Sequence, residues 1–572
     1  LIPALLAYIT WLPALMGFGT LVLGRSALSA TEDCDPSALT QVVVAGFALF
    51  ALLVDLLNFV LPISGLVSLG LLVFGWALLL LRAKRLRQVV AMAWSGPGWL
   101  LAGLVALLVL IPAYVMRFWA PDYDQGLYYL QSIRWIGDSK LPVGLANLYD
   151  ALGYNQSWFS ITAGLQTPWL IDKGSLLLNG LLFIGYGTAI LLSVARLLSG
   201  RFDLPTVFLA LTGLPWLTFA RPSLIGSANP DMAITYLTLL LTYLMLRVLT
   251  GQGDAARQLA IAIAFVAFAT TVKLSGIALI ALPAVTVGWI AVRSRSRGDA
   301  LSLVRGLRWG VLAAAGLLVP WSIRGVLLSG CFAYPVQVTC VPSLPWTIPE
   351  SVGAAHRSAI IGWSRSPGVA AAQALDNWHW VGPWFGREFA GNIRVRLGAG
   401  MLLAGAAMWL ASRVGGKDHK PAETILVPGV ALLAGLVFWF LTAPAVRFGE
   451  GYIWGLPLLV LSAGVCAAQA AFGRLWWRAA VGGLAVVLLA GWGTLLARRS
   501  IVSTGLPLVA WPQLPTSSVQ ANANNPDVYS PRATDQCWNT HLPCTPILLP
   551  ELRVQKDRGL LGETWRFEAK GA

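Results

Sequence analysis

Charged residues are scarce in this chain: Asp, Glu, Lys and Arg make up 11% of its 572 residues, against roughly a quarter in soluble domains. Hydrophobic residues make up 57%, and the mean hydropathy is +0.70. This composition excludes an ordinary soluble protein. It indicates instead that lipid solvates much of the surface.

Three further features are missing, and each absence narrows the interpretation. There is no internal repeat of the kind that builds many secondary transporters. The cysteines show no C-x-x-C spacing, which argues against a structural zinc site. The first apolar stretch has no basic n-region and no A-x-A site before Arg25, so we expect it to be a retained helix rather than a signal sequence.

Apolar runs recur along the whole chain at the length of about 20 residues that crosses a bilayer. They should be helices, because backbone polar groups in lipid must be satisfied within the segment. The predicted fold is therefore an all-α polytopic membrane protein with about 13–14 transmembrane helices. The predicted spans are 2–23, 40–60, 63–81, 98–115, 175–195, 204–220, 233–249, 258–272, 275–292, 309–328, 397–412, 424–441, 452–471 and 479–496.

Basic clusters between the spans predict the orientation. They are Arg82, Lys84, Arg85 and Arg87; Arg293, Arg295, Arg297, Arg305 and Arg308; Arg413, Lys417 and Lys420; and Arg474 and Arg478. Alternating spans place all of them on one side, which the positive-inside rule assigns to the cytoplasm. The expected location is the bacterial inner membrane. The net charge of +15 then reflects residues that face anionic lipid, and it does not indicate nucleic-acid binding.

The opposite, external side receives the long loops 116–174 and 329–396, which interrupt a membrane domain of residues 1–496. It also receives the carboxy-terminal segment 497–572. Within that segment, 507–531 is rich in Pro, Asn and Ser and is typical of a linker. Residues 535–567 contain cysteines and tryptophans, which indicates a structured unit.

Two close cysteine pairs fall on this external side. Cys331 and Cys340 lie in one long loop, whereas Cys537 and Cys544 lie in the carboxy-terminal segment. Because the external side is oxidising, we expect two disulfides that close small loops. Zinc is the alternative, but the four thiols are split between distant segments.

Asp122 and Asp124 begin the first long external loop, directly after a span. A carboxylate near low dielectric can have a raised pKa and act as a base toward a hydroxyl. Two carboxylates can also hold a divalent cation, the only cofactor that the sequence suggests. The structural alternative is a helix cap for the apolar run that follows.

Three cations are predicted at the same membrane level: Lys273, Arg324 and Arg447. Together they could hold a phosphate or pyrophosphate, although each by itself could simply extend its charged end into the interface. Asp231, just before a span, is either a supporting acid or a helix cap. Aromatic residues of the loops, which include Trp158 and Trp380, could stack on sugars or form the interfacial belt. For His356 and His379 we expect a solvated position in the loop.

Several short motifs follow one another along most of the chain. They are Asp122-Tyr-Asp124-Gln-Gly-Leu-Tyr128, Gly144-Leu-Ala-Asn147, Leu152-Gly-Tyr154-Asn155-Gln-Ser-Trp158, Pro320-Trp-Ser-Ile-Arg324 and Leu542-Pro-Cys544. In this order, and on this side of the membrane, they resemble the membrane-embedded glycosyltransferases of the GT-C superfamily and in particular a bacterial branch of polytopic proteins. The resemblance implies transfer of a sugar from a polyprenyl-phosphate-linked donor to the hydroxyl of an envelope glycan, lipid or protein.

The resemblance also implies roles for individual residues. Asp124, supported by Asp122, would be the general base, and Lys273, Arg324 and Arg447 would hold the donor phosphate. Residues expected to contact substrate or support the site are Asp231, Glu450, Tyr128, Tyr154, Asn155 and Trp158. The alternative functions are a secondary transporter or flippase of a lipid-linked or anionic substrate, a polysaccharide polymerase or ligase, and a non-catalytic assembly protein.

Overall fold

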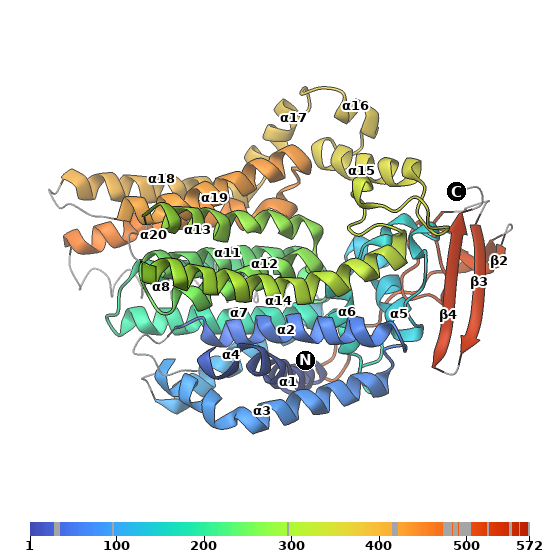
Figure 1. Ribbon diagram of the computed structural model, residues 1–572, viewed down its shortest axis with the longest axis horizontal. Helices are drawn as coiled ribbons and strands as arrows, with labels where there is room; N and C mark the ends of the chain where they lie inside the picture. Colours follow the sequence, from blue (N-terminus) through green and yellow to red (C-terminus); the bar gives the residue numbers. More distant parts are fainter. Residues whose placement is uncertain are drawn as a thin grey trace.

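The computed structural model shows a bundle of long helices with a layer of loops, short helices and strands at one end (Figure 1). We call this the loop end. The structure describes residues 1–27, 35–93, 97–293, 297–414, 421–472, 505–522, 525–547, 552–559 and 561–569, with isolated residues 483, 490 and 493.

Twelve helices in the described part of the chain are long and apolar enough to cross a membrane, which indicates a multi-pass membrane protein. They are α1 (Ile2–Ala27), α2 (Ala38–Asn58), α3 (Gly65–Ala93), α4 (Gly98–Val115), α7 (Gly174–Leu198), α11 (Asp231–Leu249), α12 (Ala255–Val272), η5 with α13 (Leu274–Ile280 and Ala281–Arg293), α14 (Arg297–Ser329), α18 (Ile393–Val414), α19 (Pro421–Thr442) and α20 (Val446–Phe472). Each corresponds to a predicted span.

Two predicted spans are not among the twelve. The run 204–220 forms α8 (Leu204–Leu211) and α9 (Gly213–Thr218), which together are too short to cross the membrane alone. The break falls at Thr212 because Pro215 has no N–H to donate to the carbonyl of Leu211. The run 479–496 lies almost entirely outside the described residues.

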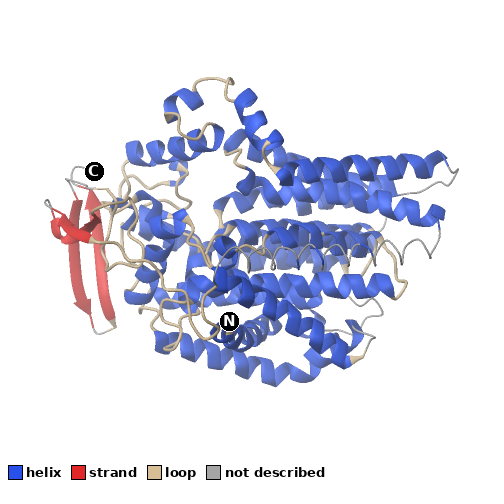
Figure 2. Ribbon diagram, turned by 180° about the vertical axis from the view of Figure 1, so that it is seen from behind, coloured by secondary structure: helices blue, strands red, loops and turns tan. Residues whose placement is uncertain are grey.

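Short elements make up the helical part of the loop end. They are η1 (Met116–Phe118), η2 (Gln125–Tyr129), α5 (Leu130–Asp138), η3 (Leu145–Asn147), η4 (Asp150–Gly153), α6 (Ser157–Gly164), α10 (Pro222–Ile225), η6 (Gln337–Thr339), α15 (Glu350–Arg365), α16 (Ala371–Leu375), α17 (Val381–Phe385) and η7 (Gly386–Ala390). The two long loops predicted on one side lie at the same end of the bundle, 116–174 in cyan and 329–396 in yellow in Figure 1, and Figure 2 shows this end from behind.

The carboxy-terminal segment adds two antiparallel hairpins, so the fold is not purely helical. They are β1 (Val519–Asn522) with β2 (Asn525–Pro531), and β3 (Leu552–Gly559) with β4 (Gly562–Ala569). The first hairpin occupies part of the predicted linker 507–531. Both predicted disulfides are present, Cys331–Cys340 and Cys537–Cys544.

The strand β4 binds the first long loop through its backbone. The N–H of Val143 donates to the carbonyl of Trp565, and the N–H of Phe567 donates to the carbonyl of Val143, both over 2.9 Å. Gly144 follows with a φ of +71°, and a Cβ there would lie 2.1 Å from the carbonyl oxygen of Phe567. Only glycine fits this position, which explains the glycine of the Gly144-Leu-Ala-Asn147 motif.

The helix α11 runs through the middle of the bundle, and almost all of its side chains are buried. Tyr236 stacks on Tyr186 of α7 with ring centroids 4.4 Å apart. Asp231, the first residue of α11, lies at the loop end. Arg247, in the last turn of α11, lies at the opposite end. The central packing therefore fixes the position of Asp231.

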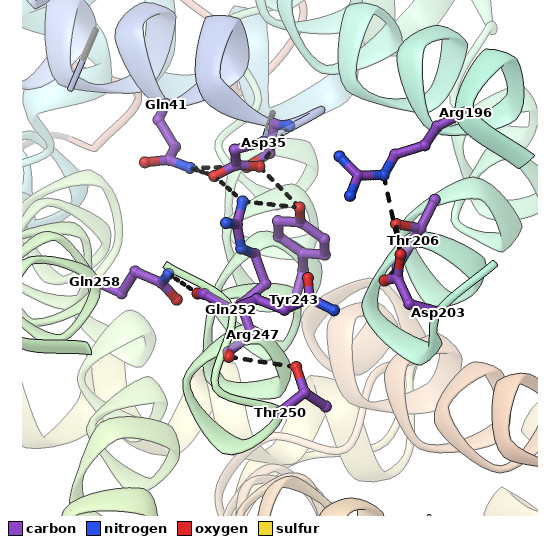
Figure 3. Close-up of polar contacts among 11 residues, drawn as sticks. Asp35, Gln41, Arg196, Asp203, Thr206, Tyr243, Arg247, Thr250, Gln252 and Gln258 are labelled. Atoms are coloured by element: carbon purple, nitrogen blue, oxygen red, sulfur yellow. Dashed lines mark hydrogen bonds and ion pairs between the residues drawn. The ribbon is translucent and has the colours of Figure 1, made fainter. Parts of the chain in front are cut away.

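A polar cluster joins elements at the end opposite the loops (Figure 3). Asp35, ahead of α2, forms an ion pair with Nη1 of Arg247 at 2.5 Å. Its carboxylate also accepts hydrogen bonds from the hydroxyl of Tyr243 and from Nε2 of Gln41, both at 2.7 Å. Because each charged group has partners, the cluster links the first helices to α11 without leaving an unpaired charge.

Candidate functional site

The segment 119–124, which we call the acidic segment, crosses the loop end after α4. Trp119 fixes its start, since its indole Nε1 donates to the carbonyl of Gly226 over 2.8 Å. Asp124 immediately precedes η2, a single π-helical turn, but its side chain makes no capping hydrogen bond. The cap alternative therefore fails for Asp124, and its carboxylate is directed elsewhere.

Asp124 binds a cation from the last described span. Its Oδ2 accepts a hydrogen bond from Nη1 of Arg447, in the first turn of α20, over 3.0 Å. The hydroxyl of Tyr129 lies 3.5 Å from the same oxygen. The two ends of this ion pair are separated by more than 300 residues, so only the fold brings them together.

Asp122 has a different environment. Its Oδ2 accepts a hydrogen bond from Nδ2 of Asn229 over 3.3 Å. Burial, followed by the negative charge of Asp124, raises the pKa of Asp122 above its ordinary value. A carboxyl with a raised pKa binds a proton more readily, which is the property expected of a general base.

Lys273 and Asp231 form the third charged contact, in which Nζ binds Oδ1 of the carboxylate. Lys273 directly follows α12 and Asp231 begins α11, so the pair joins two neighbouring spans at the loop end. The side chains are only 20% and 10% exposed. Lys273 therefore binds a carboxylate of the neighbouring span, and protein covers most of its side chain.

One aromatic ring brings the two cations together. Nζ of Lys273 lies 3.9 Å from the ring centroid of Phe448, and Cζ of Arg447 lies 4.8 Å from the same centroid. Arg447 also lies 5.0 Å from the ring of Trp363 in α15. Both cations thus lie in one compact region that also holds the carboxylates of Asp124 and Asp231.

A chain of amide and indole hydrogen bonds holds Asn229 in place. Nδ2 of Asn179 donates to the carbonyl of Asn229 over 3.0 Å, and Nε1 of Trp158 lies 3.2 Å from Oδ1 of Asn179. Oδ1 of Asn229 accepts the backbone N–H of Asp231 over 2.8 Å. Trp158 is fully buried. It therefore supports the site from behind, and it does not present its ring for stacking on a sugar.

Two arginines of this end did not stand out in the sequence. Arg394 of α18 forms an ion pair with Glu450, one turn beyond Arg447 on α20. Arg221 precedes α10, and its side chain has no hydrogen-bond or ion-pair partner in the described residues. Burial lowers the pKa of Arg221 from its usual value. A cation that is partly desolvated and unpaired is available to an anionic ligand.

Arg324 does not belong to this group of cations, which corrects the predicted cluster of three. It forms an ion pair with Asp55 of α2, Nε to Oδ1 over 3.4 Å, and its Nη1 also binds Oδ1 of Asn155. Ser160 donates to the same carboxylate over 2.5 Å. Arg324 therefore faces the interior between α2 and α14, and Asn155 shares that structural role.

The remaining predicted residues form an aromatic group beside the site. Tyr128 packs on Tyr129 with ring centroids 4.7 Å apart and on Tyr154 at 5.5 Å. Tyr154 binds Nε2 of His356 through its hydroxyl, and Nδ1 of His356 lies 2.8 Å from Oδ2 of Asp150. The prediction of a solvated His356 is therefore wrong, because its side chain is 13% exposed and has a partner at each nitrogen.

Metal binding has little support in the geometry. Among the residues that the structure describes, no group of three or more His, Cys, Asp or Glu side chains is placed to hold a metal ion. Asp122 and Asp124 would supply two of the oxygens of a divalent cation, and Mg²⁺ commonly takes its remaining oxygens from water and from substrate phosphates.

The model of a domain of unknown function, DUF8201, matches residues 2–454. The chain belongs to the DUF8201 family. This match includes the acidic segment, Lys273, Arg447 and Glu450, whereas the hairpins of the carboxy-terminal segment lie beyond it. No curated protein and no solved structure matches the chain. The chemical interpretation of the DUF8201 site therefore depends on its own geometry.

Proposed function

We propose that this DUF8201 protein is a glycosyltransferase of the GT-C type. It moves a sugar from a polyprenyl-phosphate-linked donor to an acceptor hydroxyl at the external face of the inner membrane. The observation that carries the proposal is the meeting of the acidic segment with two cations at the loop end, in the ion pair of Asp124 with Arg447 and the shared ring of Phe448.

The location suits a lipid-linked donor. A polyprenyl tail stays in the hydrocarbon, so its phosphate is presented where membrane helices end. Lys273 and Arg447 lie at such helix ends, directly after α12 and in the first turn of α20. A phosphate that reaches them would bind beside their carboxylate partners, because a guanidinium has five N–H donors and an ammonium has three. Hydrogen bonds between two charged groups are strong, so two such cations suit a phosphate.

The transfer step then follows from the charges. Asp122 accepts the proton of the acceptor hydroxyl while the oxygen forms a bond to the anomeric carbon of the sugar. The bond between that carbon and the phosphate oxygen breaks, and polyprenyl phosphate leaves with the electron pair. Lys273 and Arg447 stabilise the negative charge that develops on the phosphate, the kind of electrostatic stabilisation that contributes most to many enzymes.

We assign the base role to Asp122 rather than to Asp124, the residue that the family resemblance favoured. Asp124 already binds the guanidinium of Arg447 and lies within 3.5 Å of the hydroxyl of Tyr129, so its Oδ2 is occupied. Asp122 has the raised pKa and binds the neutral amide of Asn229. Asp124 then acts as a positioning residue that orients the guanidinium of Arg447.

The test is a transfer assay with the full chain in lipid nanodiscs. Polyprenyl-phosphate donors that carry radiolabelled sugars are mixed with envelope membranes, and label in the lipid-free or high-mass fraction is measured. Asp122→Asn should lower the rate by about 10²- to 10⁴-fold, the usual contribution of a general base. Asp376→Asn changes an exposed carboxylate of the same end of the bundle and should leave the rate within about twofold of wild type.

Two results would count against the proposal. One is the absence of transfer from every polyprenyl-phosphate sugar tried. The other is an Asp122→Asn variant that retains full activity while its melting temperature is unchanged.

A secondary transporter or flippase would best explain the buried ion pair of Asp55 and Arg324, because charges inside spans often mark transport pathways. Yet Asp55 lies three residues from the end of α2, and Arg324 lies five from the end of α14. Both are therefore near the loop end rather than halfway along the bundle. The assay separates the two functions, since a flippase moves lipid without forming a new glycosidic bond.

A further inference from the structure

The carboxy-terminal segment reaches back to the acidic segment through one short loop. We call residues 535–544 the clamp loop. Nε2 of Gln536 donates to the carbonyl of Tyr123 over 2.9 Å, and the hydroxyl of Tyr123 binds the carboxylate of Asp535. Tyr123 lies between the two aspartates of the site, so these contacts hold the backbone that carries both carboxylates.

The clamp loop also holds the turn that follows. The backbone N–H of Trp538 donates to the carbonyl of Gly126 over 2.9 Å. Its indole covers Gly126 so closely that a Cβ on this glycine would lie 2.5 Å from Cε2 of the ring. The glycine is therefore needed at this position for the ring to lie flat against the backbone of η2.

Helix α5 binds the clamp loop from the other side. Nε2 of Gln131 donates to the carbonyls of Trp538 and Thr540, over 2.9 and 3.1 Å. Nη1 of Arg134 donates to the carbonyls of Asn539 and Thr540, over 2.8 and 3.1 Å. The carbonyls of three consecutive residues thus accept four hydrogen bonds from α5. These bonds leave this part of the loop little freedom to move relative to the helix.

A disulfide and an uncommon backbone conformation shape the clamp loop itself. Cys537 and Cys544 form a disulfide, and both are buried. They are seven residues apart in the sequence, so the bond closes a short loop that contains Trp538. Trp538 has a φ of 47°, in the left-handed region that residues other than glycine rarely adopt. Such a conformation persists only where the surroundings enforce it, and here the disulfide and the bonds to α5 do so.

We propose that the clamp loop is the positioning device of the acidic segment, so that sugar transfer depends on the Cys537–Cys544 disulfide. This inference rests on the proposed function for its effect on rate, but not for its effect on structure. When the disulfide is absent, Trp538 is released and the backbone from Asp122 to Gly126 loses its outer support. A displacement of about 1 Å at a reacting group costs on the order of 10²-fold in rate.

The test compares the two disulfides of the loop end. The clamp variant carries Cys537→Ser with Cys544→Ser, and its matched control carries Cys331→Ser with Cys340→Ser, which removes a disulfide from the other loop. Hydrogen exchange of the peptide 119–130 should rise several-fold in the clamp variant and stay unchanged in the control. Transfer should fall by about 10- to 100-fold in the clamp variant and by less than about twofold in the control.

A second pair of variants retains all cysteines, in case the clamp variant fails to fold. Gly126→Ala places a methyl group into the indole of Trp538, whereas Gly137→Ala in α5 meets nothing closer than 4.0 Å. Gly126→Ala should reproduce the faster exchange and the lower rate, and Gly137→Ala should reproduce neither.

Each outcome decides one of the two claims. Unchanged exchange of 119–130 in both the clamp variant and Gly126→Ala overturns the inference, whatever the activity. Faster exchange with full transfer overturns the dependence of the reaction on the clamp loop. If the wild-type protein transfers no sugar at all, the proposed function fails, while the exchange data still decide whether the clamp loop positions the acidic segment.

Discussion

Arg447 donates a hydrogen bond from Nη1 to Oδ2 of Asp124 over 3.0 Å and thereby joins the start of α20 to the segment after α4. Lys273 makes the equivalent contact to Asp231 within the same region. Two of the three carboxylates thus bind one cation each, and Asp122 is the one that binds an amide instead. Because their partners differ, these charged side chains should differ in their effects on stability and on activity.

The ion pair itself should couple only moderately to stability. Side-chain exposures of 36% for Arg447 and 18% for Asp124 leave water in contact with the pair. A double-mutant cycle of Arg447→Gln and Asp124→Asn should therefore give a coupling energy of about 1 kcal/mol, measured by denaturant unfolding in detergent. In the same variants the rate of sugar transfer should fall by a larger factor than the equilibrium constant for folding. Equal losses in both would reduce Arg447 to a structural role.

The raised pKa of Asp122 predicts a pH dependence with a definite sign. Burial favours the neutral carboxyl in the folded state. The stabilising effect is therefore fully present below the unfolded pKa of about 3.9 and is lost as pH rises through the higher folded pKa. Asp122→Asn removes this titration, so the variant should lose less stability than wild type over that interval. Thermal unfolding followed across the acidic range measures the difference.

The activity should also depend on the ionisation of Asp122, but it should rise with pH where this contribution to stability falls. A base must be deprotonated, so kcat/KM should rise with pH and level off above the raised pKa of Asp122. The acidic limb should lie above the ordinary range of an aspartate and disappear in the residual activity of Asp122→Asn. An identical limb in that variant would show that another group titrates, and Asp376→Asn provides the control in which the limb should be kept.

Arg221 should contribute to donor affinity. Its guanidinium Nε is buried and has no partner among the described residues. Arg221→Ala should raise KM for the polyprenyl-phosphate donor by about tenfold with little change in kcat, as expected when a charge-assisted hydrogen bond is lost. Arg396→Ala, an exposed arginine of α18 two residues beyond Arg394, is the matched control. Equal KM values in the two variants would exclude Arg221 from the donor site.

The helical fold could be predicted because the length of an apolar run can be read directly from the sequence. Twelve of the expected spans were recovered as helices of membrane-spanning length. The break at Thr212 was missed because a proline within an apolar run is common in transmembrane helices and does not by itself end a span. The strand β3 was missed because its residues are mostly exposed, so it lacks the apolar alternation that identifies a strand.

The candidate site could be predicted in part, because the sequence shows which charged residues lie near the ends of apolar helices but not the direction in which each side chain points. Lys273, Arg447 and Asp124 were expected at one end, and the structure brings them together. Arg324 lies at a similar depth but faces α2. Asn229 and Arg221 were missed for a related reason, because their importance arises from contacts with residues far away in the sequence.

The buried ion pair of Asp55 and Arg324 should contribute to the stability of the fold but not to donor binding. Each side chain is 5% exposed, so removing one partner leaves an uncompensated charge in a region of low dielectric. Arg324→Met should cost about 3–5 kcal/mol in denaturant unfolding, and adding Asp55→Asn should restore part of that loss. Lys556→Met, which breaks a half-exposed pair with Glu563 on the β3–β4 hairpin, should cost less than about 1 kcal/mol. Because Arg324 faces away from the cations of the site, the folded fraction of Arg324→Met should bind the donor with an unchanged KM, and a tenfold higher KM would return Arg324 to the phosphate site.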